Sequence, residues 1–202
     1  MPPHPLLPAR PLVLASTSRY RQELMRRLGA PFEAVAPDYE EQHDLGLPPD
    51  ELVLELALHK ARSLAPRFPD ALIIGSDQLA ELDGQILLKP GTASRARAQL
   101  ARLAGRTHRL LTGLVVLEPR SGRVERDLDL HRMTLRPLTE RQIADYVALE
   151  SPLDCAGSYK VEGPGIALFC AMEGQDYTAI IGLPLTRLVT LLLRFSDPAG
   201  CD

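Results

Sequence analysis

The chain has 202 residues, of which 45% are apolar, and a formal net charge of −3 at pH 7. The length suits one domain or two small lobes with a substantial core, and the composition is that of a soluble globular protein. The slight acidic balance argues against a dedicated binder of nucleic acid or of acidic membranes, because such proteins normally carry a basic excess.

The first half of the chain alternates between strand and helix patterns. The expected elements are a strand at 12–15, a helix from Ser18 to Gly29, a strand at 32–37, a helix capped by Asp50 that ends near 65, and strands at 71–82 and 85–89. The helices show apolar residues at three- and four-residue spacing, and Asp83-Gly84 predicts a tight turn between the last two strands.

Hairpin patterns prevail in the second half. The expected elements are a helix at 92–104, long strands at 107–118 and 123–136, a helix at 139–149 with a capping box, further strands at 154–169 and 177–182, and a closing helix at 184–195. Early alternation followed by hairpins predicts an α/β fold with a mixed sheet and flanking helices.

The start of the first helix is rich in groups that bind anions. Ser16, Thr17 and Ser18 supply hydroxyls, and a helix N-terminus presents unsatisfied N–H groups and a partial positive charge. Arg21 lies three and four residues before the apolar Leu24 and Met25, so we expect it on the side of the helix that faces the core. The stretch is either an ordinary helix cap or a site for an anion.

Two charged residues interrupt apolar patterns. Lys60 lies inside the apolar stripe of its helix, so its ammonium group must either extend to solvent or meet an anion. Asp77 shares one face of a buried strand with Ile73 and Leu79. A carboxylate there needs a cation, hydrogen-bond donors or a raised pKa, unless the strand ends in solvent at this point.

Other charged residues are ambiguous when taken singly. Lys89 precedes a proline at a strand end and has the ordinary interpretation of a surface lysine, while Glu162 precedes two glycines and fits an ordinary turn. Together with Glu40, the groups above suit a metal-bound polyphosphate. Walker A, G-x-G-x-x-G, serine-hydrolase and zinc-protease motifs are all absent.

Cysteine usage favours a reducing compartment. Cys155, Cys170 and Cys201 show neither metal-ligand spacing nor a disulfide framework. The first ten residues lack the pattern of a signal peptide, and no apolar run is long enough to cross a bilayer. We therefore expect a cytoplasmic protein without a membrane partner.

These stretches are similar to the Maf family of nucleoside triphosphate pyrophosphatases. The matching segments are LASTSRYRQELMRRLG at 14–29, HKA at 59–61, IIGSDQ at 73–78, KP at 89–90, GRTHRLLTGLVV at 105–116, YV at 146–147, DCAGSYKVEGPG at 154–165 and IIGLPL at 180–185. They follow one another in order from about Leu12 to Leu192, and the collinear set is far more specific than any one segment.

The resemblance implies an enzyme that cleaves nucleoside triphosphates between the α and β phosphates with a divalent cation, Mg²⁺ or Mn²⁺. It implies two lobes around a cleft and a nucleotide as substrate. It also implies that there is no nucleic-acid partner, and it suggests a homodimer. On this basis we expect a flexible extension at 1–10, one pyrophosphatase domain at 11–195 and a tail at 196–202.

The resemblance also implies roles for individual residues. The triphosphate would be held by Ser16, Arg21, Lys60 and Lys89. Glu40 and Asp77 would hold the metal, and Asp77 would accept the proton of the attacking water.

Three positions indicate the substrate. Gln78 and Glu162 resemble the branch of the family that hydrolyses 7-methyl-GTP, whereas the branch acting on dTTP and UTP has Thr and Gln there. The methylated purine is positively charged, so the ring of Tyr20 could stack on it and a carboxylate could complement it. The chain departs from the family at Arg19, where Pro is usual, and at Tyr20, where this branch has Trp.

Three alternatives stay open. The first is the same reaction on dTTP, UTP or other non-standard nucleotides. The second is a nucleotide-binding regulator of cell division that has lost catalysis, and the third is a structural or protein-interaction module. The last must explain why a lysine lies on an apolar helix face without a ligand.

Overall fold

The computed structural model describes residues 4–40 and 45–196. The chain forms two compact units. The first comprises Met1–Asp77, Thr112–Asp129 and Asp176–Asp202, and the second comprises Gln78–Leu111 and Leu130–Gln175.

The first unit is a sheet with helices on both faces. Its strands are β1 (Leu12–Ala15), β2 (Glu33–Val35) and the first-unit parts of β3 (Leu72–Leu82), β5 (Thr107–Glu118) and β6 (Arg123–Leu135). Its helices are α1 (Arg19–Arg27), α2 (Pro49–Leu64), α5 (Tyr177–Ile181) and α6 (Leu185–Leu193). The strand order is β2-β1-β3-β5-β6, and β1 is parallel to both β2 and β3.

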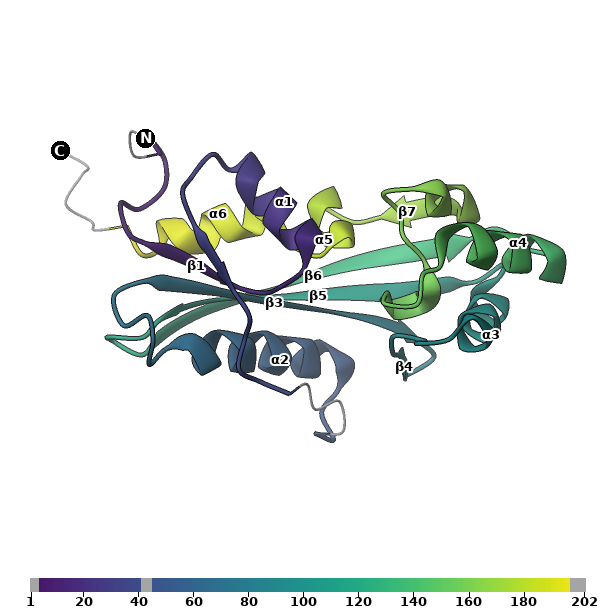
Figure 1. Cartoon of the computed structure of the whole chain (residues 1–202), viewed down its shortest axis with the longest axis horizontal. Helices are drawn as coiled ribbons and strands as arrows, with labels where there is room; N and C mark the ends of the chain where they lie inside the picture. Colours follow the sequence, from purple (N-terminus) through teal and green to yellow (C-terminus); the bar gives the residue numbers. More distant parts are fainter. Residues whose placement is uncertain (1–3, 41–44, 197–202) are drawn as a thin grey trace. The chain divides into compact units, whose positions relative to one another are not determined.

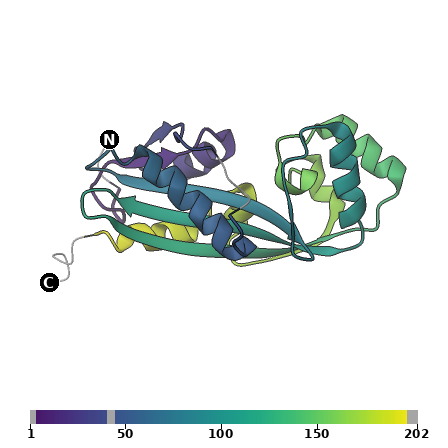
Figure 2. The same ribbon diagram turned by 90° about the horizontal axis from the view of Figure 1, so that it is seen from below.

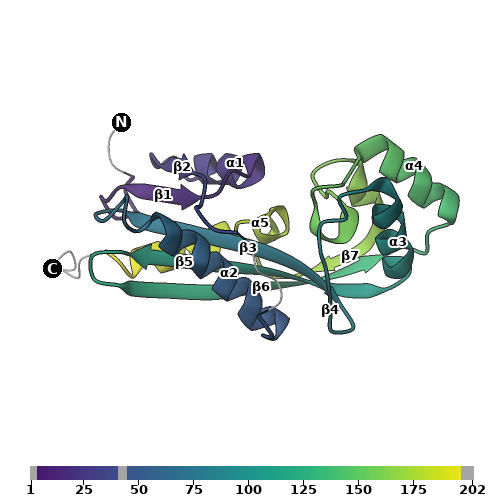
Figure 3. The same ribbon diagram turned by 60° about the horizontal axis from the view of Figure 1, so that its bottom comes forward.

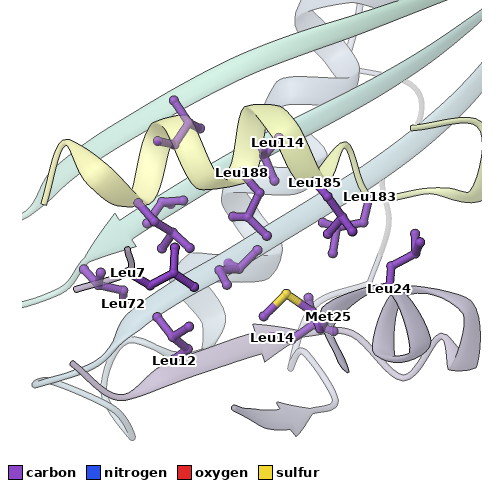
Figure 4. Packing of buried hydrophobic residues seen from close by; sticks show 14 of the residues in the cluster. Leu7, Leu12, Leu14, Leu24, Met25, Leu72, Leu114, Leu183, Leu185 and Leu188 are labelled. Carbon is purple, nitrogen blue, oxygen red and sulfur yellow. The ribbon is translucent and has the colours of Figure 1, made fainter. Parts of the chain in front are cut away.

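Side chains alternate between the two faces of β1 and β3, because successive residues of a strand point to opposite sides. Leu14 and Ile74 belong to a core that includes α1 and α6, whereas Val13 and Ile73 pack with residues of α2. Figure 1 shows α2 on one face of the sheet with α1 and α6 on the other, and Figure 2 shows α2 crossing the strands. The close-up in Figure 4 shows the leucines of the α6 face.

Helix α2 lies unusually close to the sheet. A Cβ atom added to Gly75 of β3 would lie 2.1 Å from the carbonyl oxygen of Ala57. Only glycine permits this approach. It brings the buried face of α2, which includes Lys60, against β3.

The second unit combines the remaining parts of β3, β5 and β6 with short elements. These are β4 (Gln85–Leu87), α3 (Ala93–Leu103), α4 (Glu140–Glu150), the 3₁₀ helices η1 (Ala156–Ser158) and η2 (Pro164–Leu168), and β7 (Phe169–Glu173). β4 pairs antiparallel with β3, and β7 pairs antiparallel with β6 (Figure 3). Thr92 caps α3, and Thr139 with Gln142 forms the predicted capping box of α4.

The predicted α/β fold with a mixed sheet and flanking helices is confirmed. Two of the predicted strands are wrong. The segment 154–168 contains turns and 3₁₀ helices, with a strand only at 169–173, and 177–181 is a helix capped by Asp176. The predicted cap of α2 is also wrong: Pro48 holds the N-cap position, and Asp50 lies in the first turn behind Pro49, a favoured first helical residue. Within the described residues, no helix combines the length and the apolarity needed to span a bilayer.

Candidate active site

The carboxyl end of β1 lies beside the middle of β3, and predicted site residues occur at both places. The parallel register pairs Leu14 with Ile74, so the end of β1, which Ser16 follows, lies beside the part of β3 that leads to Ser76 and Asp77. Ser16 is buried, and its Oγ accepts a hydrogen bond from the backbone N–H of Ser18 at 3.1 Å. Ligands of open α/β sheets bind outside the carboxyl ends of parallel strands, and β1 ends here.

The start of α1 lies close to the carboxyl end of β1, because only three residues separate the two elements. The Oγ of Ser18 accepts a hydrogen bond from the N–H of Arg21, so Ser18 is the helix cap that the sequence predicts. Arg21 is half-buried, and its Nε donates to the carbonyl oxygen of Gly182 at 2.8 Å. Ser76 Oγ donates to the same oxygen at 3.0 Å. This carbonyl therefore ties the arginine at the helix start to the strand residue before Asp77.

Lys60 and Asp77 form a buried ion pair. Lys60 Nζ lies 2.6 Å from Asp77 Oδ1, and each residue is only 5% exposed. The interpretation of Lys60 as a side chain reaching solvent is wrong, and so is that of Asp77 as a strand end, because β3 continues to Leu82. The lysine instead neutralises the carboxylate that the strand buries.

The second carboxylate oxygen of Asp77 needs a partner. Asp77 Oδ2 is buried and has no hydrogen-bond partner among residues 4–40 and 45–196. Buried polar atoms are nearly always satisfied by protein, ordered water or an ion. A carboxylate oxygen in this position suits a divalent cation or the proton of a bound water.

Glu40 lies in the loop after β2, and its side chain is exposed. The loop is fastened to α2, because the N–H of Asp38 donates to Ser63 Oγ and that hydroxyl donates to the carbonyl oxygen of Lys60. In the described part of the chain, no three His, Cys, Asp or Glu side chains gather as a metal site. A cation held by Glu40 and Asp77 would complete its shell with water and phosphate oxygens, as Mg²⁺ usually does.

Tyr20 is half-buried on α1 beside Arg19. The guanidinium carbon of Arg19 lies 4.8 Å from the centre of the tyrosine ring, and an Arg19 nitrogen donates to Tyr20 Oη at 2.9 Å. The ring thus already holds one cation against its face. A charged purine stacking on Tyr20 would use the other face or displace Arg19.

The second unit carries the other predicted site residues. Gln78 follows Asp77 in β3 and is half-buried, Lys89 is exposed just after β4, and Glu162 is exposed in the turn before η2. Their contact with the nucleotide is part of the proposal below.

Ser76 and Gly182, whose hydrogen bonds hold Arg21 near β3, are not among the residues predicted above. Both lie inside segments that carry the family resemblance, IIGSDQ and IIGLPL, so a signal was present. The hydrogen bond between them links residues 106 positions apart, which no local pattern reveals.

A cavity of about 520 Å³ lies at the other end of β1. Its lining comes from residues 4, 7–13, 30–33 and 68. None of the predicted site residues is among them.

An α/β fold with cations, hydroxyls and a buried carboxylate near the carboxyl end of a parallel strand is typical of proteins that bind phosphate chains. Residues 11–195 match the family described as Maf-like protein, and the chain belongs to this family.

Relatives named 7-methyl-GTP pyrophosphatase are similar over most of their length. The protein from Syntrophotalea carbinolica is 50% identical over 185 residues, which is 91% of this chain and 94% of the relative. The protein from Pseudomonas aeruginosa is 49% identical, covering 91% of this chain and 95% of the relative, and that from Pseudomonas putida is 50% identical, covering 91% and 96%.

Proposed function

We propose that this protein is a nucleoside triphosphate pyrophosphatase that hydrolyses 7-methyl-GTP to 7-methyl-GMP and pyrophosphate. The observation that carries the proposal is the buried Lys60–Asp77 pair, with the unsatisfied Asp77 Oδ2, on the strand that pairs with β1 shortly before α1 begins. The names of relatives about 50% identical support both the reaction and the substrate.

The triphosphate binds at the start of α1. The N–H groups of the first turn and the Ser16 hydroxyl donate to phosphate oxygens, and the helix dipole favours their negative charge. The contact of Arg21 Nε with Gly182 fixes the plane of the guanidinium, so its terminal nitrogens approach the phosphates in a set direction. Lys60 and Lys89 add positive charge where the leaving pyrophosphate develops negative charge.

Asp77 acts as the general base. Its Oδ2 accepts a proton from the water that attacks the α phosphorus, while Lys60 holds Oδ1 and so fixes the carboxylate plane. A bond forms between the water oxygen and the α phosphorus, and the bond to the α–β bridging oxygen breaks. The electron pair leaves with pyrophosphate.

Glu40 and Asp77 offer carboxylate oxygens that suit Mg²⁺ or Mn²⁺. A divalent cation bound there would neutralise phosphate charge and make a bound water more acidic. We expect addition of EDTA to abolish turnover and excess Mg²⁺ to restore it.

Gln78, Glu162 and Tyr20 select the base. The carboxylate of Glu162 complements the positive charge of the methylated purine, and the ring of Tyr20 attracts it through a cation–π contact. Dependence on the methyl group's charge sets this enzyme apart from one that acts on neutral pyrimidines.

We further propose that the enzyme is a cytoplasmic homodimer that acts on free nucleotides, with residues 11–195 as its catalytic domain. Sedimentation velocity would distinguish dimer from monomer.

The test is a panel of triphosphates assayed for pyrophosphate release in Mg²⁺ buffer. We expect kcat/KM for 7-methyl-GTP to exceed that for GTP by at least about 10- to 30-fold, the contribution of one desolvated cation–π contact alone. A preference for dTTP or UTP would contradict the substrate assignment. Binding of nucleotides without hydrolysis would contradict the enzymatic function and favour a regulator.

A further inference from the structure

Ser158 has a backbone conformation that is unusual for a serine. Its φ is +64°, in the left-handed region, and the residue is fully buried. Gly157 before it is also left-handed, and a Cβ there would lie 2.7 Å from the ring of Tyr159. Tyr159 is itself anchored, because its Oη hydrogen-bonds to His108 Nε2 at 2.8 Å and its ring packs edge-on against Phe169. Such conformations persist only where the surroundings enforce them, and they cluster at functional sites.

The hydroxyl of Ser158 begins a short hydrogen-bond relay. Ser158 Oγ donates to Gln99 Oε1 at 2.5 Å, and Gln99 Nε2 donates to the carbonyl oxygen of Leu88 at 2.8 Å. An amide side chain has one accepting and one donating end. Because the serine engages the accepting end, the donating end of Gln99 faces the backbone immediately before Lys89.

The segment around Lys89 is held on its other side too. The N–H of Gly91 donates to the carbonyl oxygen of Leu153 at 3.0 Å. The loop 153–158 therefore fixes the backbone on both sides of Lys89, directly through Leu153 and indirectly through Gln99. The same loop continues into the turn that carries Glu162.

We propose that Ser158 and Gln99 are positioning residues that hold Lys89 for the phosphate chain of the nucleotide. The inference rests on the proposed function, in which Lys89 binds phosphate. A long exposed lysine on a loosely held loop loses much conformational freedom when it binds, and a fixed backbone reduces that loss. Substrate affinity, rather than the rate of the chemical step, should therefore depend on the relay. The loop that carries the base-selecting Glu162 also sets the phosphate contact.

Ser158→Gly separates this role from a structural one. Glycine adopts φ +64° without strain, so the variant should keep or raise the melting temperature while it loses the hydroxyl. We expect KM for 7-methyl-GTP to rise about tenfold, as for loss of one ionic contact, with kcat changed less than about twofold. Gln99→Leu, which keeps the side-chain bulk, should give the same split. The control Thr139→Ala removes the capping box of α4, so it should lower the melting temperature and leave KM unchanged.

A double-mutant cycle with Lys89→Ala tests whether the relay acts through the lysine. If it does, Ser158→Gly should raise KM less than about twofold further in the Lys89→Ala background. An unchanged KM in Ser158→Gly, or the same tenfold rise with and without Lys89, would overturn the inference. Calorimetric titration with pyrophosphate gives the same comparison without turnover. Failure of the proposed function would instead appear as absent hydrolysis by the unmodified protein.

Discussion

Replacing Asp77 with asparagine tests the buried ion pair and the general base together. The two side chains have nearly the same shape, and the asparagine carbonyl can still accept the hydrogen bond from Lys60 Nζ that Asp77 Oδ1 accepts at 2.6 Å. The variant removes only the negative charge and the basic oxygen. It removes the carboxylate that faces the ammonium group of Lys60, which is 5% exposed.

The expected losses follow from burial and from chemistry. Removing one partner of a buried ion pair costs roughly 3 kcal/mol or more. For a chain of this size, that corresponds to a decrease in melting temperature of roughly 6–12 °C. Loss of a positioned general base should lower kcat by about 10²- to 10⁴-fold.

Thermal melts and pyrophosphate release measure the two effects separately. The control is the double variant Lys60→Met/Asp77→Asn, which buries no unpaired charge and should recover most of the lost stability without recovering turnover. Asp77→Asn with a wild-type melting temperature would contradict the buried pair. Turnover within fivefold of wild type would refute Asp77 as the base.

Three further predictions concern charge and pH. Glu162→Gln should lower kcat/KM for 7-methyl-GTP by about tenfold while changing that for GTP little, because a carboxylate's charge complements only the methylated base. Equal losses of kcat/KM for the two nucleotides would contradict this role. Arg21→Lys should raise KM about tenfold, since an ammonium group cannot both contact Gly182 and present a planar fork to phosphate; an unchanged KM counts against the arginine. Burial lowers the pKa of His108 from 6.5 to about 4, so the folded state binds its proton less readily than the unfolded state does. The neutral His108 should therefore contribute up to about 3 kcal/mol to the free energy of unfolding above pH 6.5, and this contribution should disappear towards pH 4. Urea unfolding should show a flatter pH dependence of that free energy for His108→Gln between pH 6.5 and pH 4.

Periodicity in the sequence predicts most of the elements and marks Lys60 and Asp77 as charged residues within apolar patterns. The stripe around Lys60 and the alternation around Asp77 each leave burial and exposure to solvent open, and both residues are buried. The sequence does not say that they meet each other, because their partners are set by the packing of α2 on β3. Gly75, which permits that close packing, is visible in the sequence only as a glycine inside a strand pattern.

The local sequence pattern predicts the wrong structure for the segment 154–168, for a different reason. Its apolar and β-branched residues favour a strand, but Gly157 and Ser158 adopt consecutive left-handed conformations, which interrupt a regular strand. Those conformations depend on Tyr159 meeting His108 and on Ser158 meeting Gln99, contacts that link residues 51 and 59 positions apart. Tertiary contacts therefore override local propensity here.

Hydrolysis of 7-methyl-GTP in ¹⁸O-labelled water, followed by mass spectrometry of both products, tests the central claim most directly. If the site directs water to the α phosphorus, the label enters 7-methyl-GMP and pyrophosphate remains unlabelled. Label in pyrophosphate, or release of orthophosphate in its place, would contradict the mechanism.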